Sequence, residues 1–397
     1  MKFNLSKKGL GITPSVTLEI TAKAKAMKDS GIDVISFGAG EPDFNTPENI
    51  QNEGIRAIKE GLTRYTPASG IIELKKAICG KLKEENGLEY KPNNIIISNG
   101  AKHSIHNALM AILNPGDEVI FTVPYWVSYP ELVTLADGIP VYIETKEEND
   151  FKFNVEDLNN VLTEKTKAII LNSPSNPTGA IYNKEELQAI ADWAVKNNVF
   201  VISDEIYEKL VYDDEEHICI SSLNDDIKDL TILINGMSKV YAMTGWRIGY
   251  AAAHEDIVKV MSNIQSHATS NPCSISQYAS VEGILGDQSS VEEMKKHFAE
   301  RRNYMAETIN SIKGLSCRKP QGAFYIMVNF TQLLGKTIRG REINSSLDFG
   351  NLLLEEGKVA VVPGIAFGDD KYIRLSYATS LDNIRNGLER IRQIVEE

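Results

Sequence analysis

Lys239 stands in a stretch whose residue types suit chemistry, residues 235–250, which read NGMSKVYAMTGWRIGY. Ser238 precedes it, and Arg247 follows a short way downstream. The run before it, residues 230–236, is continuously apolar until an Asn-Gly pair, which predicts a buried parallel strand that ends in a turn. Open α/β sheets bind ligands at the carboxyl ends of their strands, so a lysine placed here is a candidate for chemistry and not a typical surface lysine.

The residues that follow the predicted strand 94–98 are of types that bind anions or metals. Gly100 lies between a predicted strand and a predicted helix, so the amides of Ala101 and Lys102 are candidates for a phosphate cup. A plain strand-to-helix turn is the alternative. His103 and His106 have the i, i+3 spacing of metal ligands, but no third ligand stands near them. We expect a packed or solvated histidine pair there, and no metal.

Other strand ends add groups that suit a ring and a carboxylate. Asp204 directly follows a buried strand, where a carboxylate is costly unless a cation pairs with it, and Tyr207 shares its loop. Asn176 is held in the rigid turn NSPSNPTG, and Trp126 is either a core residue or a flat wall for a ring. Arg374 lies in an apolar strand and suits either a bidentate carboxylate clamp or a structural ion pair. With Lys239, this set of groups describes a site for pyridoxal phosphate and an amino acid.

The elements that must position these residues alternate along the chain. Helix-like segments separate apolar runs, and in one of them Asn183 and Glu186 form a capping-box-like start. The alternation predicts an α/β fold with a mostly parallel central sheet, followed by a smaller α+β domain that begins with a long helix at residues 291–313. We expect an N-terminal arm with part of the small domain at 1–47, a large domain at 48–288 and the rest of the small domain at 289–397. The predicted strands are residues 94–98, 118–123, 140–144, 167–172, 199–204, 230–236 and 248–253.

The composition excludes several classes of protein. The 397 residues are 42% hydrophobic and 24% charged, as in an ordinary globular protein, and the net charge of -12 argues against a nucleic-acid binder. No stretch has the apolar length of a membrane span, and no apolar signal segment follows the N-terminus. Four scattered cysteines without a CxxC pair are typical of a reducing compartment, so we expect a cytoplasmic protein.

The ordered set of motifs resembles the class I aminotransferases of fold type I that depend on pyridoxal phosphate, and among them the prokaryotic aspartate aminotransferase subgroup. The resemblance covers nearly the whole chain. The motifs are TPSVTLEITAKAK, AGEPDFNTP, RYTPASG, PYWVSYPE, SPSNPTGAIY, SDEIYEKLVY, AMTGWRIGY and IRLSYATS.

The resemblance implies catalytic roles for several residues. Lys239 is expected to form the Schiff base with the cofactor and to move protons during the reaction. Asp204 is expected to pair with the ring nitrogen, while Tyr207 and Asn176 hydrogen-bond the ring oxygen and Trp126 stacks on the ring. The cofactor is an electron sink for the carbanion formed at the substrate Cα. Transfer of the amino group to a second keto acid then implies ping-pong kinetics.

The resemblance also implies how substrate and phosphate are held. Arg374 is expected to grip the substrate α-carboxylate, helped by Asn176 and the backbone of Gly40. Tyr65 is expected to reach the phosphate of a neighbouring subunit, which implies a homodimer with shared active sites. The expected phosphate ligands on the same chain are Gly100, Ala101, Lys102, Ser238 and Arg247.

Substrate choice depends on a second carboxylate. Lys102, with hydroxyls from Ser15 and Thr17, matches the positions that meet the distal carboxylate of an acidic substrate, which favours L-aspartate and 2-oxoglutarate as the substrate pair. Aromatic or prephenate specificity and C–S β-lyase chemistry on cysteine conjugates are the alternatives. A nicotinamide dehydrogenase is excluded, because the first strand turn lacks a G-x-G-x-x-G. Two departures from relatives are Gly236, where some have a phosphate-binding serine, and Ile72, where many have proline.

Overall fold

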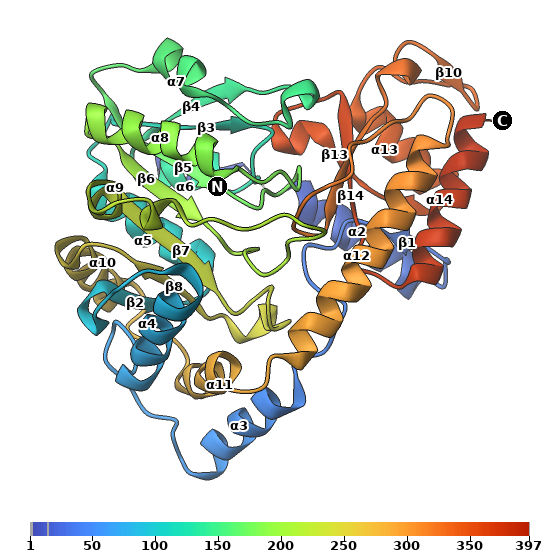
Figure 1. Ribbon diagram of the computed structural model, residues 1–397. Coiled ribbons are helices and arrows are strands. Elements are labelled where there is room, and N and C mark those ends of the chain that lie inside the picture. The colour runs from blue at the N-terminus through green and yellow to red at the C-terminus, as the bar shows by residue number, and fades with distance from the viewer. Residues whose placement is uncertain (1–2, 14–15, 397) are drawn as a thin grey trace.

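The computed structural model describes residues 3–13 and 16–396, and its centre is a seven-stranded sheet (Figure 1). The strand order is β2-β8-β7-β6-β5-β3-β4. β8 is antiparallel to both of its neighbours, and the other pairs are parallel. The predicted apolar runs are thus confirmed as the strands of one mostly parallel sheet. They are β2 (Ile95–Ser98), β3 (Glu118–Val123), β4 (Ile139–Glu144), β5 (Thr166–Asn172), β6 (Phe200–Asp204), β7 (Thr231–Gly236) and β8 (Gly249–Ala252).

Alternate residues of these strands enter different hydrophobic cores, because side chains along a strand point to opposite faces. On β7, Ile232 and Ile234 pack with α5 (Ala101–Ile112), α6 (Tyr129–Leu135) and α10 (Glu255–Ala268). Leu233 packs against the helices on the opposite face of the sheet. Because helices cover both faces, the strands are apolar along their whole length. The helices of the opposite face are α3 (Glu48–Lys59), α4 (Ile72–Asn86), α11 (Ser274–Leu285), α7 (Val155–Val161), α8 (Lys184–Asn197) and α9 (Asp225–Leu230).

The predicted capping box starts α8. The side chain of Asn183 accepts a hydrogen bond from the Glu186 amide at 2.9 Å, and the Glu186 carboxylate accepts one from the Asn183 amide at 2.8 Å. Two amides that have no partner inside the helix are thereby satisfied.

A second layer stands beside the large sheet and has its own core (Figure 1). Its three-stranded antiparallel sheet has the order β13-β14-β9, and α12 (Ser289–Asn310) confirms the predicted long helix. The domain limits themselves stay a prediction. The other elements of this region are α2 (Val16–Asp29), β1 (Ile35–Ser36), β9 (Tyr325–Asn329), β10 (Thr337–Ile338), β11 (Arg341–Glu342), α13 (Ser346–Glu355), β12 (Val359–Ala360), β13 (Val362–Pro363), β14 (Tyr372–Ser376) and α14 (Leu381–Glu396).

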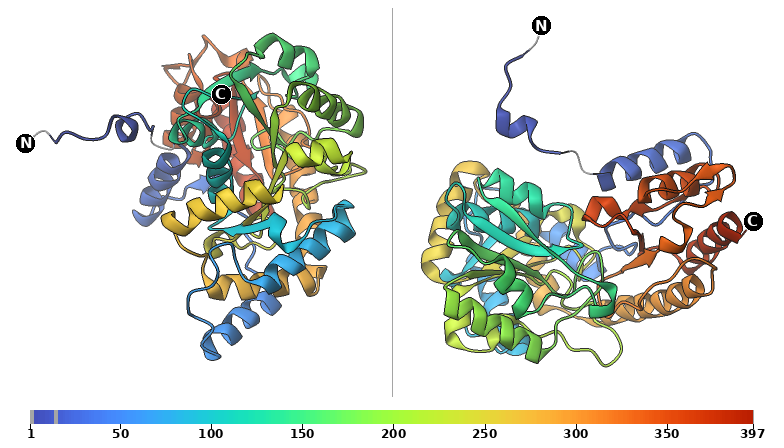
Figure 2. Two further views of the ribbon diagram at one scale, coloured as in Figure 1. Left: turned by 90° about the vertical axis from the view of Figure 1, so that its left-hand side faces the viewer. Right: turned by 90° about the horizontal axis from the view of Figure 1, so that it is seen from above.

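The N-terminal segment reaches away from the body of the molecule and carries the short helix α1 (Lys7–Leu10) (Figure 2). Its contacts with the rest of the chain include an ion pair of 2.8 Å between Lys8 and Asp137. Within the described ranges, no helix combines the length and apolar character that a membrane span requires.

Candidate active site

A cavity of about 490 Å³ lies at the carboxyl ends of β5, β6 and β7, where they face β9 and β14. This is the edge at which ligands bind to parallel sheets. The sequence-predicted residues that line it are Gly40, Ala101, Lys102, Trp126, Asn176, Asp204, Tyr207, Ser238, Lys239, Arg247 and Arg374.

Lys239 follows β7 and places its amine inside the cavity. Its Nζ donates a hydrogen bond of 2.5 Å to the carbonyl of Gly40. Burial lowers the pKa of Lys239 to about 8, Glu41 opposes the shift, and the cationic side chains of Arg374 and Arg247 add to it. A lysine with a lowered pKa is more often neutral near neutral pH, and the neutral amine is the form that attacks a carbonyl carbon.

Asp204 ends β6 as a buried carboxylate. Tyr129 Oη donates to its Oδ2 at 2.7 Å, and the Ile206 amide donates to Oδ1 at 3.3 Å. Burial raises the pKa of Asp204 to about 6, although both hydrogen bonds oppose the shift. No ion pair to Asp204 is formed within the part of the chain that the structure describes, so a cationic ring nitrogen fits this carboxylate chemically.

Tyr207 joins the two layers of the molecule at the cavity. Its Oη lies 3.0 Å from the Oη of Tyr325 on β9, and the two rings meet edge to face. The Lys239 Nζ lies 6.0 Å from the centre of the Tyr207 ring. The Tyr207 ring is therefore on the same side of the cavity as the Lys239 amine.

Arg374 is buried on β14 and has the geometry of a carboxylate clamp. Its Nη1 donates to Asn176 Oδ1 at 2.9 Å and its Nη2 donates to the Gly38 carbonyl at 3.3 Å, while Nε has no partner. The guanidinium lies over the rings of Tyr325 and Phe367, at 4.3 and 4.8 Å from their centres. Within residues 3–13 and 16–396, no carboxylate pairs with it. A buried guanidinium of this kind requires an anionic partner, and a substrate carboxylate supplies one.

The residues predicted to form a phosphate cup lie where α5 begins. Gly100 caps this helix at a φ of 84°, and a side chain there would place Cβ 2.4 Å from Arg247 Nη2. Arg247 is fixed by hydrogen bonds of 2.8 and 3.3 Å to the carbonyls of Thr244 and Asn99. Buried Ser238 lines the same end of the cavity. Helix amides, a guanidinium and a hydroxyl form a donor set that fits a phosphate.

Close backbone packing explains why position 236 is a glycine. A Cβ on Gly236 would lie 2.8 Å from the Cα of Gly249 and from the carbonyl oxygen of Ile248 on the neighbouring segment. A Cβ on Gly249 would in turn lie 2.2 Å from the amide nitrogen of Ala101. The backbones of β7, β8 and the start of α5 are therefore in direct contact beneath the phosphate cup.

Trp126 and Lys102 form one wall of the cavity. The Lys102 Nζ lies 5.0 Å from the centre of a Trp126 ring, and Trp126 meets Tyr129 edge to face. Burial lowers the pKa of Lys102, and the charge of Arg247 adds to this effect. A flat aromatic wall with a cation at its edge suits a planar ring that bears acidic groups.

Some predicted residues are not in the cavity. Tyr65 is 91% exposed and does not contact the site of its own chain. Ser15 lies outside the described residues. Thr17 lies in α2, but its side chain is not part of the described structure. His103 Nδ1 accepts a hydrogen bond from the Asn99 amide at 3.2 Å, and the His103 and His106 rings stack on each other, so the two histidines are packed.

Glu41, Tyr129 and Tyr325 are among the cavity residues that were not predicted from the sequence. Glu41 lines the cavity and accepts a hydrogen bond of 2.7 Å from Thr244, Tyr129 holds Asp204, and Tyr325 holds Tyr207. Glu41 is adjacent to Gly40, and Tyr129 stands three residues after Trp126, so both were within reach of the predicted motifs. Tyr325 belongs to a strand far along the chain, and no local spacing identifies it.

Comparisons with known proteins identify the family. The model of the family "Aminotransferase class I and II" matches residues 32–391. An aspartate aminotransferase of Bacillus sp. (strain YM-2) is 51% identical, with 100% of both chains covered. The aspartate aminotransferase structure from Rhizobium meliloti is 42% identical, with a TM-score of 0.96 over 100% of this chain and 99% of that one. A Thermus thermophilus aspartate aminotransferase solved with maleate is 39% identical, with a TM-score of 0.93 over 99% and 100%.

This chain belongs to the class I and II aminotransferases. It has their fold type I architecture, and it is an aminotransferase that uses pyridoxal phosphate. The resemblance inferred from the motifs is thereby confirmed.

Proposed function

We propose that this enzyme transfers the amino group of L-aspartate to 2-oxoglutarate, giving oxaloacetate and L-glutamate by ping-pong chemistry. The observation that carries the proposal is Arg374, a buried guanidinium in the cavity without a carboxylate partner among the described residues. It is oriented by Asn176, and its fork fits the α-carboxylate that every substrate in the pair bears.

Lys239 is the proton carrier of the proposed reaction. Its lowered pKa lets the neutral amine accept the proton from the substrate Cα, and the resulting ammonium can return it on the same side. Asp204 holds a proton on the ring nitrogen, and Tyr207 donates a hydrogen bond to the ring oxygen. Pyridoxal phosphate, when bound, supplies the sink for the electron pair left at Cα.

Lys102 supports a substrate with two carboxylates. Its amine lies on the Trp126 wall of the same cavity that contains Arg374, so the two cations suit the two ends of a dicarboxylate. The Thermus thermophilus neighbour was solved with maleate, which is itself a dicarboxylate. An uncompensated cation beside the side-chain end of the substrate would disfavour purely apolar amino acids.

A panel of amino donors and keto acids tests the substrate choice, with prephenate and a cysteine conjugate included. We expect aspartate and glutamate to convert the bound cofactor to its amino form, as followed by its absorbance. Lys102→Met should raise the KM for aspartate about 10- to 100-fold, because a charge-assisted hydrogen bond is lost, and should lower the KM for apolar donors, because the charge that disfavours them is removed. Replacing the exposed Lys76 with Met is the control.

Two outcomes of this panel would contradict the proposal. Conversion by aromatic or branched donors without conversion by aspartate or glutamate would make the role of Lys102 wrong. Release of pyruvate from the cysteine conjugate without any transamination would favour the β-lyase alternative.

The proposal includes a homodimer with shared active sites. Phe3, Leu5 and Leu10 of the N-terminal segment are 78%, 59% and 67% exposed, and this segment reaches away from its own chain (Figure 2). Exposed apolar side chains of this kind support docking on a second copy. Tyr65, also exposed, would then enter the partner's cavity. Cytoplasmic location stays a prediction.

A further inference from the structure

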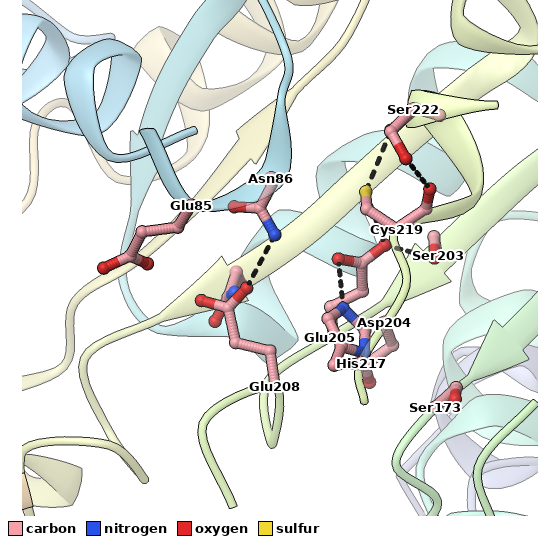
Figure 3. Close-up of polar contacts among 12 residues, drawn as sticks. Glu85, Asn86, Ser173, Ser203, Asp204, Glu205, Glu208, His217, Cys219 and Ser222 are labelled. Atoms are coloured by element: carbon pink, nitrogen blue, oxygen red, sulfur yellow. Dashed lines mark hydrogen bonds and ion pairs between the residues drawn. The ribbon is translucent and has the colours of Figure 1, made fainter. Parts of the chain in front are cut away.

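A buried polar cluster lies behind the loop that carries Asp204 and Tyr207 (Figure 3). These two residues line the cavity, whereas the side chains of Glu205 and Glu208 on the same loop belong to the cluster. The loop thus separates two groups of polar side chains, and the cluster behind it has no part in the reaction as described above.

Glu205 is the centre of this cluster. It is 1% exposed and accepts hydrogen bonds from Ser203 Oγ at 2.8 Å and from Cys219 Sγ at 3.0 Å. His217 Nε2 lies 2.9 Å from its second carboxylate oxygen. Burial lowers the pKa of His217, but the charge and hydrogen bond of Glu205 prevail and raise it overall. The contact with Glu205 therefore favours the protonated, cationic form of His217.

Glu208 forms the second ion pair of the cluster. It is paired and hydrogen-bonded with Lys81 on α4, and Asn86 Nδ2 donates to it at 3.3 Å. Burial alone would raise the pKa of Glu208, but the charges of Lys81 and His217 bring it to about 2. Lys81 also pairs with Glu85 at 3.5 Å, and Glu85 pairs with Lys209 at 2.7 Å. With His217 protonated, the charged groups of the cluster thus consist of three anions and three cations.

This balance of charge distinguishes ion pairs from a metal site. The ligand atoms of Glu205, Glu208 and His217 lie within 4.8 Å of one another, a spacing that a metal ion would accept. A bound cation would add charge where Lys81 already neutralises Glu208, and it would need His217 without its proton. The contacts therefore favour a compensated ion-pair network.

We propose that His217 is a positioning residue, which neutralises Glu205 so that the adjacent Asp204 alone presents a negative charge to the cofactor ring nitrogen. The proposal rests on the role proposed above for Asp204. A bare Glu205 anion would lie next to Asp204 in a buried environment, where like charges raise the proton affinity of a carboxyl group. The proton shared by Asp204 and the ring nitrogen would then move toward Asp204.

¹⁵N NMR of the holoenzyme, loaded with cofactor labelled at the ring nitrogen, tests this directly. His217→Gln should move the ring-nitrogen resonance toward the unprotonated position, since Glu205 loses its counter-charge. The double variant E205Q/H217Q removes both charges and should return the resonance to the wild-type position. His254→Gln is the matched control, because this exposed histidine also stands beside a carboxylate, that of Asp256, and should change nothing.

Each outcome decides for or against the proposal. An unshifted resonance in folded, cofactor-loaded H217Q overturns it. If H217Q does not fold, Ser203→Ala removes one hydrogen bond to Glu205 and should give a smaller shift in the same direction, and no shift again overturns the proposal. Failure of the double variant to restore the resonance shows a purely structural effect and also overturns it.

Two further measurements distinguish this proposal from the proposed role of Asp204, on which it rests, and from the alternative of a metal site. Asp204→Asn should shift the resonance, and an unchanged signal there overturns the role of Asp204 and this proposal together. A shifted D204N with an unshifted H217Q overturns this proposal alone. Titration of the holoenzyme with Zn²⁺ should show no stoichiometric binding, and a binding event that is lost in Glu208→Gln would replace the ion-pair network with a metal site.

Discussion

At the scale of single residues, the environment of Lys239 sets the pH range in which it can act. Burial lowers its pKa from 10.5 to about 8, so the neutral amine becomes common above that pH. The folded state binds this proton less tightly than the unfolded chain does. Lys239 therefore costs stability below about pH 8, and this cost disappears as the pH rises toward 10.5.

Competitive labelling of cofactor-free protein with acetic anhydride measures this pKa. We expect the reactivity of Lys239, read from its peptide by mass spectrometry, to rise with a midpoint near pH 8. Cofactor-loaded protein is the control, because the same amine is then blocked. A midpoint at the ordinary lysine value would show that burial does not lower the pKa.

At the scale of elements, α4 is tied to the loop that carries Asp204 and Tyr207 by the pair of Lys81 and Glu208, whose side chains are 10% and 9% exposed. Lys81→Met leaves a buried carboxylate unpaired and should lower the free energy of unfolding by ~3–5 kcal/mol. Replacing both residues with methionine should cost less, because no bare charge remains. Urea denaturation measures both changes.

The same helix provides the control for this prediction. Lys83 pairs with Glu89 at 2.7 Å, but these side chains are 66% and 76% exposed. Lys83→Met should therefore leave the unfolding curve nearly unchanged. Equal losses in K81M and K83M would contradict the importance of burial.

The sequence predicted elements and local motifs well, and contacts between distant elements poorly. The strands were recognisable because both faces of the sheet are covered, which makes each run apolar throughout. Residues such as Asp204 and Lys239 were recognisable because they directly follow such runs. Tyr325 was not, because its contact with Tyr207 joins the loop after β6 to β9 of a different sheet, and the sequence around neither residue indicates the other. The ion-pair cluster around Glu205 is a tertiary arrangement of the same kind.

At the scale of the whole molecule, the proposed dimer makes each active site depend on two chains. Lys239→Ala and Tyr65→Ala should each lower activity, the first to a trace and the second through weaker phosphate binding. When the two impaired variants are refolded together, half of the dimers are hybrids, and each hybrid has one site with both residues intact. The mixture should recover about a quarter of the wild-type activity if subunits assort randomly.

Size-exclusion chromatography of each variant checks that assembly itself is unchanged. A mixture whose activity does not exceed the mean of its two components, although hybrids form, would show that Tyr65 acts within its own chain or has no role in the site.

The direct contact of bare backbones at Gly236, Gly249 and Ala101 restricts how this phosphate site can vary over evolutionary time. A hydroxyl cannot be introduced at position 236 by one substitution alone, because any Cβ there would force β8 away from β7. The β8 backbone would then be pressed against the start of α5. A lineage that gains a serine at this position must first, or at the same time, change the spacing of these elements. Ser238, whose hydroxyl already lines the cavity, is thus a position at which small mutational steps can adjust the proposed phosphate site.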